Sequence, residues 1–327
     1  MGYDEQEYSQ KFSIRTWKRL LPFVSPYKKA FALMLFFNCL TALMDVLLPL
    51  FQRYAVDEFI EAGTLNGLWV FALCYLGAIM TQTLAVLGMG RNSMFIEMTV
   101  GRDMRRAAFT HLQTLSFSYY NVTPVGYILS RVMSDTMKIA GIIGWALPDV
   151  IWAVFYLTGA LISMLLLNWR LALVVIVIVP LIALTTAYFQ GRLLLWNRRV
   201  RKLNSRITGA FNEGITGAKT SKTLVIERDN TESFRRLTGE MYESGVKATR
   251  VRAVYVPLVL FLSTMAVAVI LVRGGQLSLQ GLIELGTLSA FTTYAVGIFE
   301  PVQLVAEYIA EFISIQASIE RVTGLLD

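Results

Sequence analysis

The chain has 327 residues, of which 55% are apolar and only 16% are charged, and its mean hydropathy is positive. So little polar surface cannot coat a soluble globule of this size, which excludes a water-soluble protein and predicts a membrane protein. The net charge of +7 suits contact with anionic membrane lipid. The basic residues follow the membrane edges and lack the aromatic interleaving that is typical of single-strand-binding proteins, which argues against a nucleic-acid partner.

Six windows of about 20 mostly apolar residues, the length that crosses a bilayer, occur along the chain. They lie at 30–50, 68–89, 145–167, 171–189, 254–272 and 286–308. The third and fourth windows are separated only by Asn168, Trp169 and Arg170, which predicts a tight hairpin with the Trp at the membrane interface. An even number of spans places both termini on the same side of the membrane.

The distribution of basic residues predicts which side that is. Residues 1–29, 90–138 and 190–252, together with Arg321, carry 27 of the 30 Lys and Arg residues. The opposite side keeps Arg53, Arg170 and Arg273. Because basic loops stay on the cytoplasmic side, the sequence predicts a multi-pass protein of the cell membrane with its N- and C-termini in the cytoplasm.

Two of these basic segments, 90–138 and 190–252, are too polar to span and too rich in helix formers to be disordered. We expect each to be a helical hairpin that continues its flanking spans into the cytoplasm. With about 25 residues in each limb, such arms reach about 30–40 Å beyond the membrane. The alternative is a self-packing cytoplasmic cap, but the predicted tips are short and polar and contain glycine.

Five segments, in chain order, resemble the transmembrane domain of type I exporters of the ABC family. The first two are WKRLLPFVSPYKKAF (17–31), similar to the family's interfacial elbow helix, and LLPLFQRYAVDEFI (47–60), similar to the outer end of its first span. In the arms, TPVGYILSRVMSD (123–135) matches at Gly126, Ser130, Arg131 and Asp135, and the second arm matches at Gly217, Lys222, Glu227 and Phe234. QASIERVTGLLD (316–327) resembles the segment that precedes the nucleotide-binding domain.

The resemblance implies an all-α membrane protein with the type I ABC exporter transmembrane fold, in which six transmembrane helices extend into two long cytoplasmic helical hairpins. Residues 1–29 would form the cytoplasmic N-terminus with the elbow helix, 30–310 the six-helix domain, and 311–327 the start of a linker to a nucleotide-binding domain. Such domains work as twelve-helix dimers in the bacterial inner membrane. The sequence leaves open whether the second transmembrane half is an identical or a different chain.

The resemblance also implies that short coupling helices at the arm tips dock into nucleotide-binding domains. The expected residues are Asn121, Val122, Thr123, Pro124 and Gly126 in the first tip and Lys219, Thr220, Ser221, Lys222, Thr223 and Leu224 in the second. No segment matches GxxxxGK[ST], the phosphate-binding loop, so we expect no catalytic residue, metal or cofactor in this chain. ATP and Mg would belong to the nucleotide-binding domain. That domain is either a continuation of this sequence, as is usual in the family, or a separate chain.

Acidic residues inside spans are costly and mark water-filled cavities or polar partners. Those in the predicted spans are Asp45, Asp149, Glu300 and Glu307. Glu300 and Glu307 share one face of the sixth span with Glu311, and no basic residue lies among them. One hypothesis is that they line the inward cavity and favour hydrophobic or amphipathic substrates, cationic ones among them, with Phe291, Tyr294 and Phe299 supplying aromatic surface. The alternative is that they pair with basic residues of a neighbouring helix or subunit.

Three functions remain compatible with these patterns. The first is the substrate-translocating half of an ATP-driven exporter that works by alternating access. The second is an ion-coupled carrier that uses the acidic residues, and the third is an isolated or engineered transmembrane domain that binds ligand without pumping. The two halves of the sequence show no inverted repeat and the long arms lie on one side only, which favours the exporter over the carrier.

Overall fold

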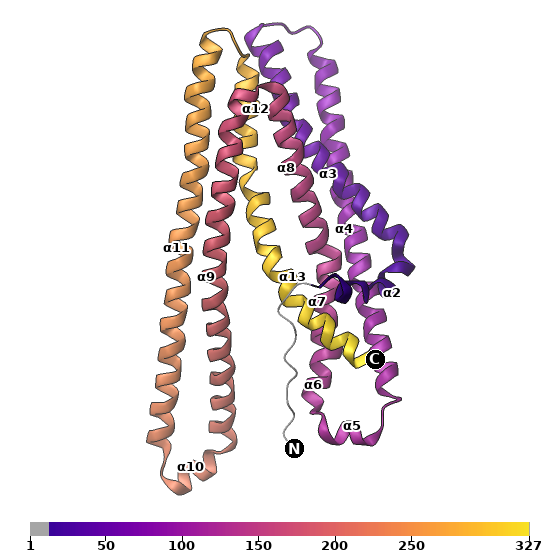
Figure 1. The fold of residues 1–327 in the computed structure, drawn as a ribbon, viewed down its shortest axis with the longest axis vertical. Coiled ribbons are helices and arrows are strands. Elements are labelled where there is room, and N and C mark those ends of the chain that lie inside the picture. The colour runs from indigo at the N-terminus through magenta and orange to yellow at the C-terminus, as the bar shows by residue number, and fades with distance from the viewer. Residues whose placement is uncertain (1–12, 327) are drawn as a thin grey trace. The chain divides into compact units, whose positions relative to one another are not determined.

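The computed structural model describes residues 13–326, and within them every regular element is a helix (Figure 1). The predicted all-α membrane fold is thereby confirmed. Residues 1–12 of the predicted cytoplasmic N-terminus, and Asp327, lie outside the described residues. The chain divides into two compact units, Met1–Ile176 with Val267–Asp327, and Val177–Ala266.

The helices follow one another with short connections. The chain begins with α1 (Ile14–Lys18), α2 (Leu21–Val24), the 3-10 turn η1 (Ser25–Tyr27), α3 (Lys28–Ala55), the π-helical turn η2 (Val56–Glu61) and α4 (Leu68–Leu112). The tip of the first arm and the helices that lead back to the third span follow. They are α5 (Phe117–Val122), α6 (Val125–Leu129), the π-helical turn η3 (Ser130–Asp135), α7 (Thr136–Gly141), the π-helical turn η4 (Ile142–Ala146) and α8 (Leu147–Leu167). The chain continues with α9 (Trp169–Thr216), α10 (Ala218–Leu224), α11 (Glu227–Leu279), α12 (Leu285–Gly297) and α13 (Phe299–Leu326).

Five of the described helical segments are long and apolar enough to cross a membrane, which confirms a multi-pass membrane protein. They are Ile14–Glu61, Leu68–Leu112, Val125–Leu167, Trp169–Thr216 and Glu227–Leu279. The sixth predicted window is divided between α12 and α13 at Ile298. Pro301 explains the division, because it lacks the N–H that would bond the carbonyl of Gly297 four residues earlier.

At the predicted hairpin between the third and fourth windows, one residue ends α8 and caps the start of α9. Asn168 has extended backbone, with φ −162°, and separates α8 from α9. Its Oδ1 accepts hydrogen bonds from the backbone N–H groups of Arg170 at 3.1 Å and Leu171 at 3.2 Å. These two donors have no partner within the helix, so an asparagine at this position stops one helix and starts the next.

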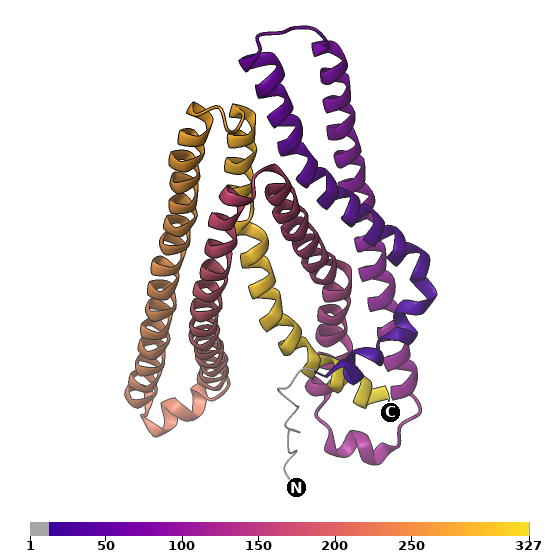
Figure 2. The same ribbon diagram turned by 45° about the horizontal axis from the view of Figure 1, so that its top comes forward.

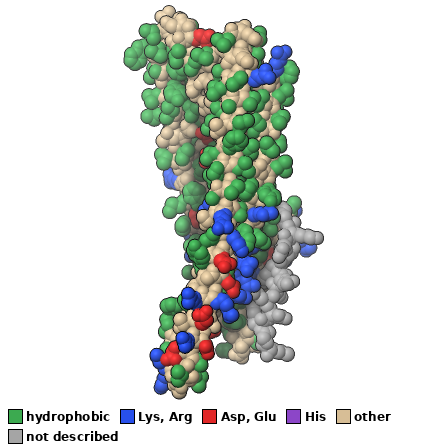
Figure 3. Space-filling model, turned by 90° about the vertical axis from the view of Figure 1, so that its left-hand side faces the viewer, with side chains coloured by type: hydrophobic (Ala, Val, Ile, Leu, Met, Phe, Trp, Pro, Cys, Tyr) green, Lys and Arg blue, Asp and Glu red, His purple; other side chains and the backbone are tan. Residues whose placement is uncertain are grey.

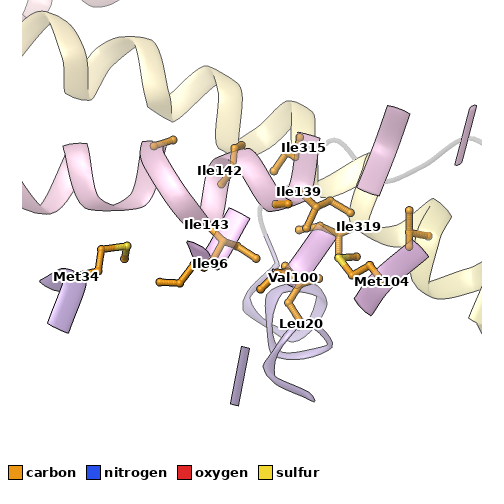
Figure 4. Packing of buried hydrophobic residues seen from close by; sticks show 13 residues of the cluster. Leu20, Met34, Ile96, Val100, Met104, Ile139, Ile142, Ile143, Ile315 and Ile319 are labelled. Carbon is orange, nitrogen blue, oxygen red and sulfur yellow. The ribbon is translucent and has the colours of Figure 1, made fainter. Parts of the chain in front are cut away.

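The main apolar core of the first unit lies where the elbow helices α1 and α2, α4, α7 and α13 meet (Figure 4). Its most deeply buried side chains, each at most 1% exposed, are Met34, Ile96, Val100, Met104, Ile139, Ala140, Ile319 and Val322. Burying an aliphatic side chain of this size stabilises a fold by about 1.5–3 kcal/mol. This cluster therefore joins the first arm to α13 and to the elbow.

Polar contacts fix the elbow on the same helices. The Tyr27 hydroxyl donates to Asp103 Oδ2 at 2.5 Å, and Arg102 Nη2 donates to the Tyr27 hydroxyl at 3.0 Å. The hydrogen bond from Tyr27 lowers the pKa of the Asp103 carboxyl, with a smaller contribution from Arg102. On the other side, the rings of Trp17 and Phe312 contact edge-on with centroids 5.4 Å apart. The elbow is thus held between α4 and α13.

At the far end of α3, charged side chains close the start of α12. The backbone N–H of Gly286 donates to Asp57 Oδ1 at 2.6 Å, and that of Leu285 donates to Glu61 Oε2 at 3.2 Å. Arg53 forms ion pairs with Glu284 at 2.7 Å and with Asp57 at 3.4 Å. The carboxylates meet the positive end of the α12 dipole, so η2 caps α12 across the outer end of the unit.

The second unit is a long hairpin of α9 and α11, which run side by side in both ribbon views (Figures 1 and 2). A 48-residue helix such as α9 is about 70 Å long, well over twice the thickness of the hydrocarbon core. Figure 3 faces the side on which α11 lies, and there hydrophobic side chains cover the upper part and charged ones gather on the lower part. Ring contacts such as Phe211 with Phe234, 6.1 Å apart, continue to the lower end. The second arm is therefore a direct extension of two spans.

Candidate functional site

The first arm ends in a short helix and a sharp break. Asn121 and Val122 form the last turn of α5, and Thr123 and Pro124 have extended backbone before α6 begins at Val125. Gly126 lies on the first turn of α6. Val122 is 66% exposed and Val125 is 75% exposed. The predicted coupling residues therefore lie on α5, its connection and the first turn of α6, where Val122 is exposed and Thr123 is buried.

The second arm ends in α10, which contains all six of the predicted residues from Lys219 to Leu224. Val225 ends the helix with left-handed backbone at φ 56°, and its side chain is 80% exposed. Lys222 Nζ lies 2.9 Å from Glu227 Oε1, and its hydrogen bond lowers the pKa of that carboxyl. Asn230 Nδ2 donates to Ser221 Oγ at 3.0 Å. These bonds tie α10 to the first turn of α11, so movement of α10 is passed to a helix that reaches into the membrane.

Two of the four acidic candidates in the spans are hydrogen-bonded inside the first unit. Asp45 accepts hydrogen bonds from Gln82 Nε2 at 2.6 Å and from Trp152 Nε1 at 2.8 Å. Asp149 accepts one from the Tyr308 hydroxyl at 2.7 Å. These carboxyl groups cross-link α3 with α4 and α8, and α8 with α13. Their geometry is that of polar packing contacts within the unit.

The aromatic candidates lie at different depths. Phe291 and Tyr294 are fully buried, and the Tyr294 hydroxyl donates to the Val46 carbonyl at 2.5 Å. Phe299 is half-buried. In this arrangement Phe291 and Tyr294 pack α12 against neighbouring helices, and Phe299 is the candidate ring that is accessible.

Glu300 and Glu307 are both exposed on α13. Glu307 Oε1 accepts a hydrogen bond from Gln303 Nε2 at 3.0 Å, one turn earlier on the same helix. Acidic groups on an exposed helix face beside the half-buried Phe299 can attract an amphipathic cation. Among the described residues no group of three or more His, Cys, Asp and Glu side chains is arranged to hold a metal ion.

The sequence was compared with models of known protein families. The ABC transporter transmembrane region matches residues 31–302, most of the chain. The chain belongs to this family. This match confirms the family resemblance seen in the first span and the two arms.

Several curated bacterial proteins are similar to this transmembrane region over nearly all of its length. An ABC transporter ATP-binding protein of Streptococcus pneumoniae is 28% identical over 95% of the chain and 53% of the relative. A Bacillus subtilis protein named for multidrug export is 25% identical over 93% of the chain and 54% of the relative. An ATP-dependent lipid A-core flippase of Desulfotalea psychrophila is 24% identical over 96% of the chain and 54% of the relative. The chain thus spans about half the length of these relatives.

The sequence reasoning missed one polar contact of this transmembrane region. Arg321 Nε donates to Asp135 Oδ2 at 2.8 Å, and Ser318 Oγ donates to Asp135 Oδ1 at 3.0 Å. Asp135 matched a family pattern in the first arm and Arg321 counted as a basic residue of the tail, but 186 positions separate them. No local periodicity relates residues so far apart, so only the fold brings them together.

Proposed function

We propose that this chain is the substrate-translocating membrane half of an ATP-driven exporter, which works by alternating access as a twelve-helix dimer. One observation carries the proposal: the long helices of the second arm extend the spans, and α10 at their end is tied to α11 through Lys222 and Glu227. A rigid helix pair turns a small rotation at one end into a large displacement at the other. The arms are therefore levers between docked domains and the membrane.

In this mechanism the nucleotide-binding domains bind ATP and Mg and close on each other. The residues from Asn121 to Gly126 and from Lys219 to Leu224 are the docking surfaces, because they present short helices at the ends of the arms. Closure draws the tips together, the arms follow as rigid bodies, and the substrate cavity turns from the cytoplasmic side to the outside. The chain's own residues supply the pathway and the coupling surface.

The second membrane half completes the pathway. The hairpin of the second unit exposes large apolar side chains along its membrane part, among them Val177 at 70%, Leu184 at 69% and Phe261 at 61%. Such a surface is stable in lipid or against another transmembrane helix, so helices of a partner half can pack there. The bacterial relatives and the basic arms support a bacterial inner membrane location with both termini in the cytoplasm.

We assign the substrate to the class of hydrophobic or amphipathic cations. Glu300 and Glu307 are exposed on α13, and the half-buried Phe299 precedes Glu300 in the chain, whereas Asp45 and Asp149 accept hydrogen bonds from other helices. The name of the multidrug-export relative agrees with this class, and the names of the flippase relatives make an amphipathic lipid the competing substrate.

The coupling role is tested by substituting one exposed residue at the tip of each arm. In the transporter assembled with its nucleotide-binding domains, Val122→Asp places a charge on the docking surface and Lys222→Glu breaks the contact with Glu227. We expect both variants to keep basal ATP hydrolysis and to lose substrate-stimulated hydrolysis and transport. Leu279→Ser, at a 92% exposed position far from the tips, is the control. Full transport in both tip variants would show that the tips are not docking surfaces.

The substrate class is tested separately. Replacing Glu300 and Glu307 by Gln keeps their size and removes their charge, and we expect the affinity for tetraphenylphosphonium to fall by about tenfold or more, since a desolvated cation–carboxylate contact contributes more than about 1.4 kcal/mol. The matched control is Glu58→Gln, an exposed carboxyl on η2. Unchanged cation affinity in the double variant would remove these residues from the substrate site.

A further inference from the structure

The last turns of α13 are held against the first arm by an ion pair in which the carboxylate is buried and the guanidinium is partly exposed. Arg321 approaches Asp135 with two nitrogen atoms, Nε at 2.8 Å from Oδ2 and Nη2 at 3.0 Å from Oδ1. Ser318 donates to the same Oδ1 at 3.0 Å and also accepts from Arg321 Nη2 at 2.8 Å. The carboxylate is thus met by three donors, all from two successive turns of one helix.

The burial around this contact makes the loss of either partner more costly than the loss of a partner in a surface ion pair. The Asp135 side chain is 4% exposed, and Ser318 is 3% exposed as a whole residue. Apolar clusters lie on both sides along α13, with Ile319 in the main core and Leu325 in a smaller cluster with Ile128. A buried bidentate pair favours one arrangement of its two helices, because removing either partner leaves an uncompensated charge in an apolar setting.

Asp135 is also placed to pass a displacement on to the arm tip. It is the last residue of the π-helical turn η3, which directly continues α6, and α6 follows the tip helix α5 after two residues. Within η3, the guanidinium of Arg131 lies 3.6 Å from the centroid of the Tyr127 ring on α6. The path from Arg321 to the tip therefore consists of packed helical turns with one break, at Thr123 and Pro124.

We propose that Asp135, Arg321 and Ser318 form a joint that fixes the end of α13 to the first arm, so that the two move as one body. The proposal rests on the proposed exporter function, in which α13 leads toward the nucleotide-binding domain. These three are positioning residues, since they act through the arm and touch neither substrate nor nucleotide. With the joint closed, a displacement at the end of α13 reaches α5 directly. With the joint open, the two ends move independently and ATP hydrolysis is no longer matched to transport.

The test compares transport per ATP hydrolysed in the assembled transporter reconstituted in liposomes. Asp135→Asn breaks the pair and keeps the size of the side chain, and Arg321→Gln breaks it by replacing the guanidinium with a shorter, uncharged amide. We expect both to lower the transport-to-hydrolysis ratio by about fivefold or more, the lower end of ordinary coupling between sites. Arg321→Lys keeps the charge and loses the bidentate contact, so its ratio should lie between those of Arg321→Gln and the unaltered protein.

The control is Glu320→Gln on the neighbouring position of α13. Glu320 accepts hydrogen bonds from Gln316 and from Thr16 of the elbow, and so it joins α13 to the elbow instead of to the arm. We expect this variant to leave the ratio unchanged. A fall as large as in Asp135→Asn would mean that any weakening of α13 lowers the ratio, and it would overturn the specific role of the joint.

A covalent replacement of the joint separates positioning from folding. In a background in which Cys39 and Cys74 are replaced by Ala, cysteines at Ile128 and Leu325, members of one apolar cluster, are cross-linked in the Asp135→Asn variant by a short bismaleimide. Recovery of the transport-to-hydrolysis ratio on cross-linking supports the joint. A ratio that stays low in the cross-linked protein overturns it, as does a ratio in Asp135→Asn equal to that of the unaltered protein.

Failure of the exporter function itself looks different in the same assay. If the unaltered assembled transporter hydrolyses ATP and moves no substrate, or moves substrate without ATP, the proposed function fails before any variant is compared. If the unaltered protein transports and all joint variants match it, the proposed function stands and the joint is wrong.

Discussion

Replacing Gly286 with alanine tests the carboxylate cap at the outer end of α12. A Cβ at this position would overlap the carbonyl oxygen of Arg53 and lie 2.5 Å from Asp57 Oδ1, a separation that real Cβ atoms essentially never show. The backbone N–H of Gly286 also donates to Asp57 Oδ1, so the helix end must move and that hydrogen bond must lengthen.

The expected loss combines two terms. Overpacking of this kind costs about 1–3 kcal/mol, and loss of a hydrogen bond to a charged acceptor costs about 1.5–3 kcal/mol, which together give about 2.5–6 kcal/mol. We expect a clearly lower apparent melting temperature, followed by intrinsic tryptophan fluorescence in detergent. Gly77→Ala is the matched control, since a Cβ there meets no atom within 4 Å inside a long helix. Equal melting of the two variants would refute the close approach of η2 and α12.

Two further predictions concern single hydrogen bonds. Tyr27→Phe removes the bond that lowers the pKa of Asp103, so amide exchange in the elbow should rise at neutral pH. A carboxyl with a lowered pKa stabilises the fold above its ordinary pKa of about 3.9 and loses that contribution as the pH falls through the lowered value, so the unaltered elbow should loosen in that acidic range and approach the exchange of Tyr27→Phe. Asp45→Asn should destabilise the protein by about 1–3 kcal/mol, measured by thermal melting, because the amide cannot accept from both Gln82 and Trp152 as the carboxylate does. Its affinity for tetraphenylphosphonium should stay unchanged, and a selective loss of that affinity would place Asp45 in the substrate site.

Features that depend on neighbouring residues could be predicted from the sequence. Asn168 lies between two apolar windows too close together for anything but a tight turn, and the structure places its side chain on the first N–H groups of α9. The spans themselves and the two arms follow from composition and helical periodicity in the same way. The short helix α10 is expected from the family resemblance, which rests on equally local patterns in the arms and which the match over residues 31–302 confirms.

Features that depend on distant residues could not be predicted. In the sequence, Asp45 and Asp149 cannot be told apart from Glu300 and Glu307, since all four are acidic residues within apolar windows. Only the fold shows that Gln82 and Trp152 donate hydrogen bonds to Asp45 and that Tyr308 donates one to Asp149. Hydrophobicity alone likewise could not separate the buried Phe291 and Tyr294 from the more accessible Phe299. The division of the sixth window follows from Pro301, a residue whose effect on the helix a hydropathy window does not register.

The most direct test of ATP-driven export is to measure which energy source drives transport. The assembled transporter is reconstituted in liposomes, and uptake of tetraphenylphosphonium is measured with ATP and Mg and, separately, with an imposed proton or sodium gradient. We predict uptake that requires hydrolysable ATP and that disappears in Val122→Asp while ATP hydrolysis continues. Uptake driven by the ion gradient in the absence of ATP would contradict this account and identify an ion-coupled carrier.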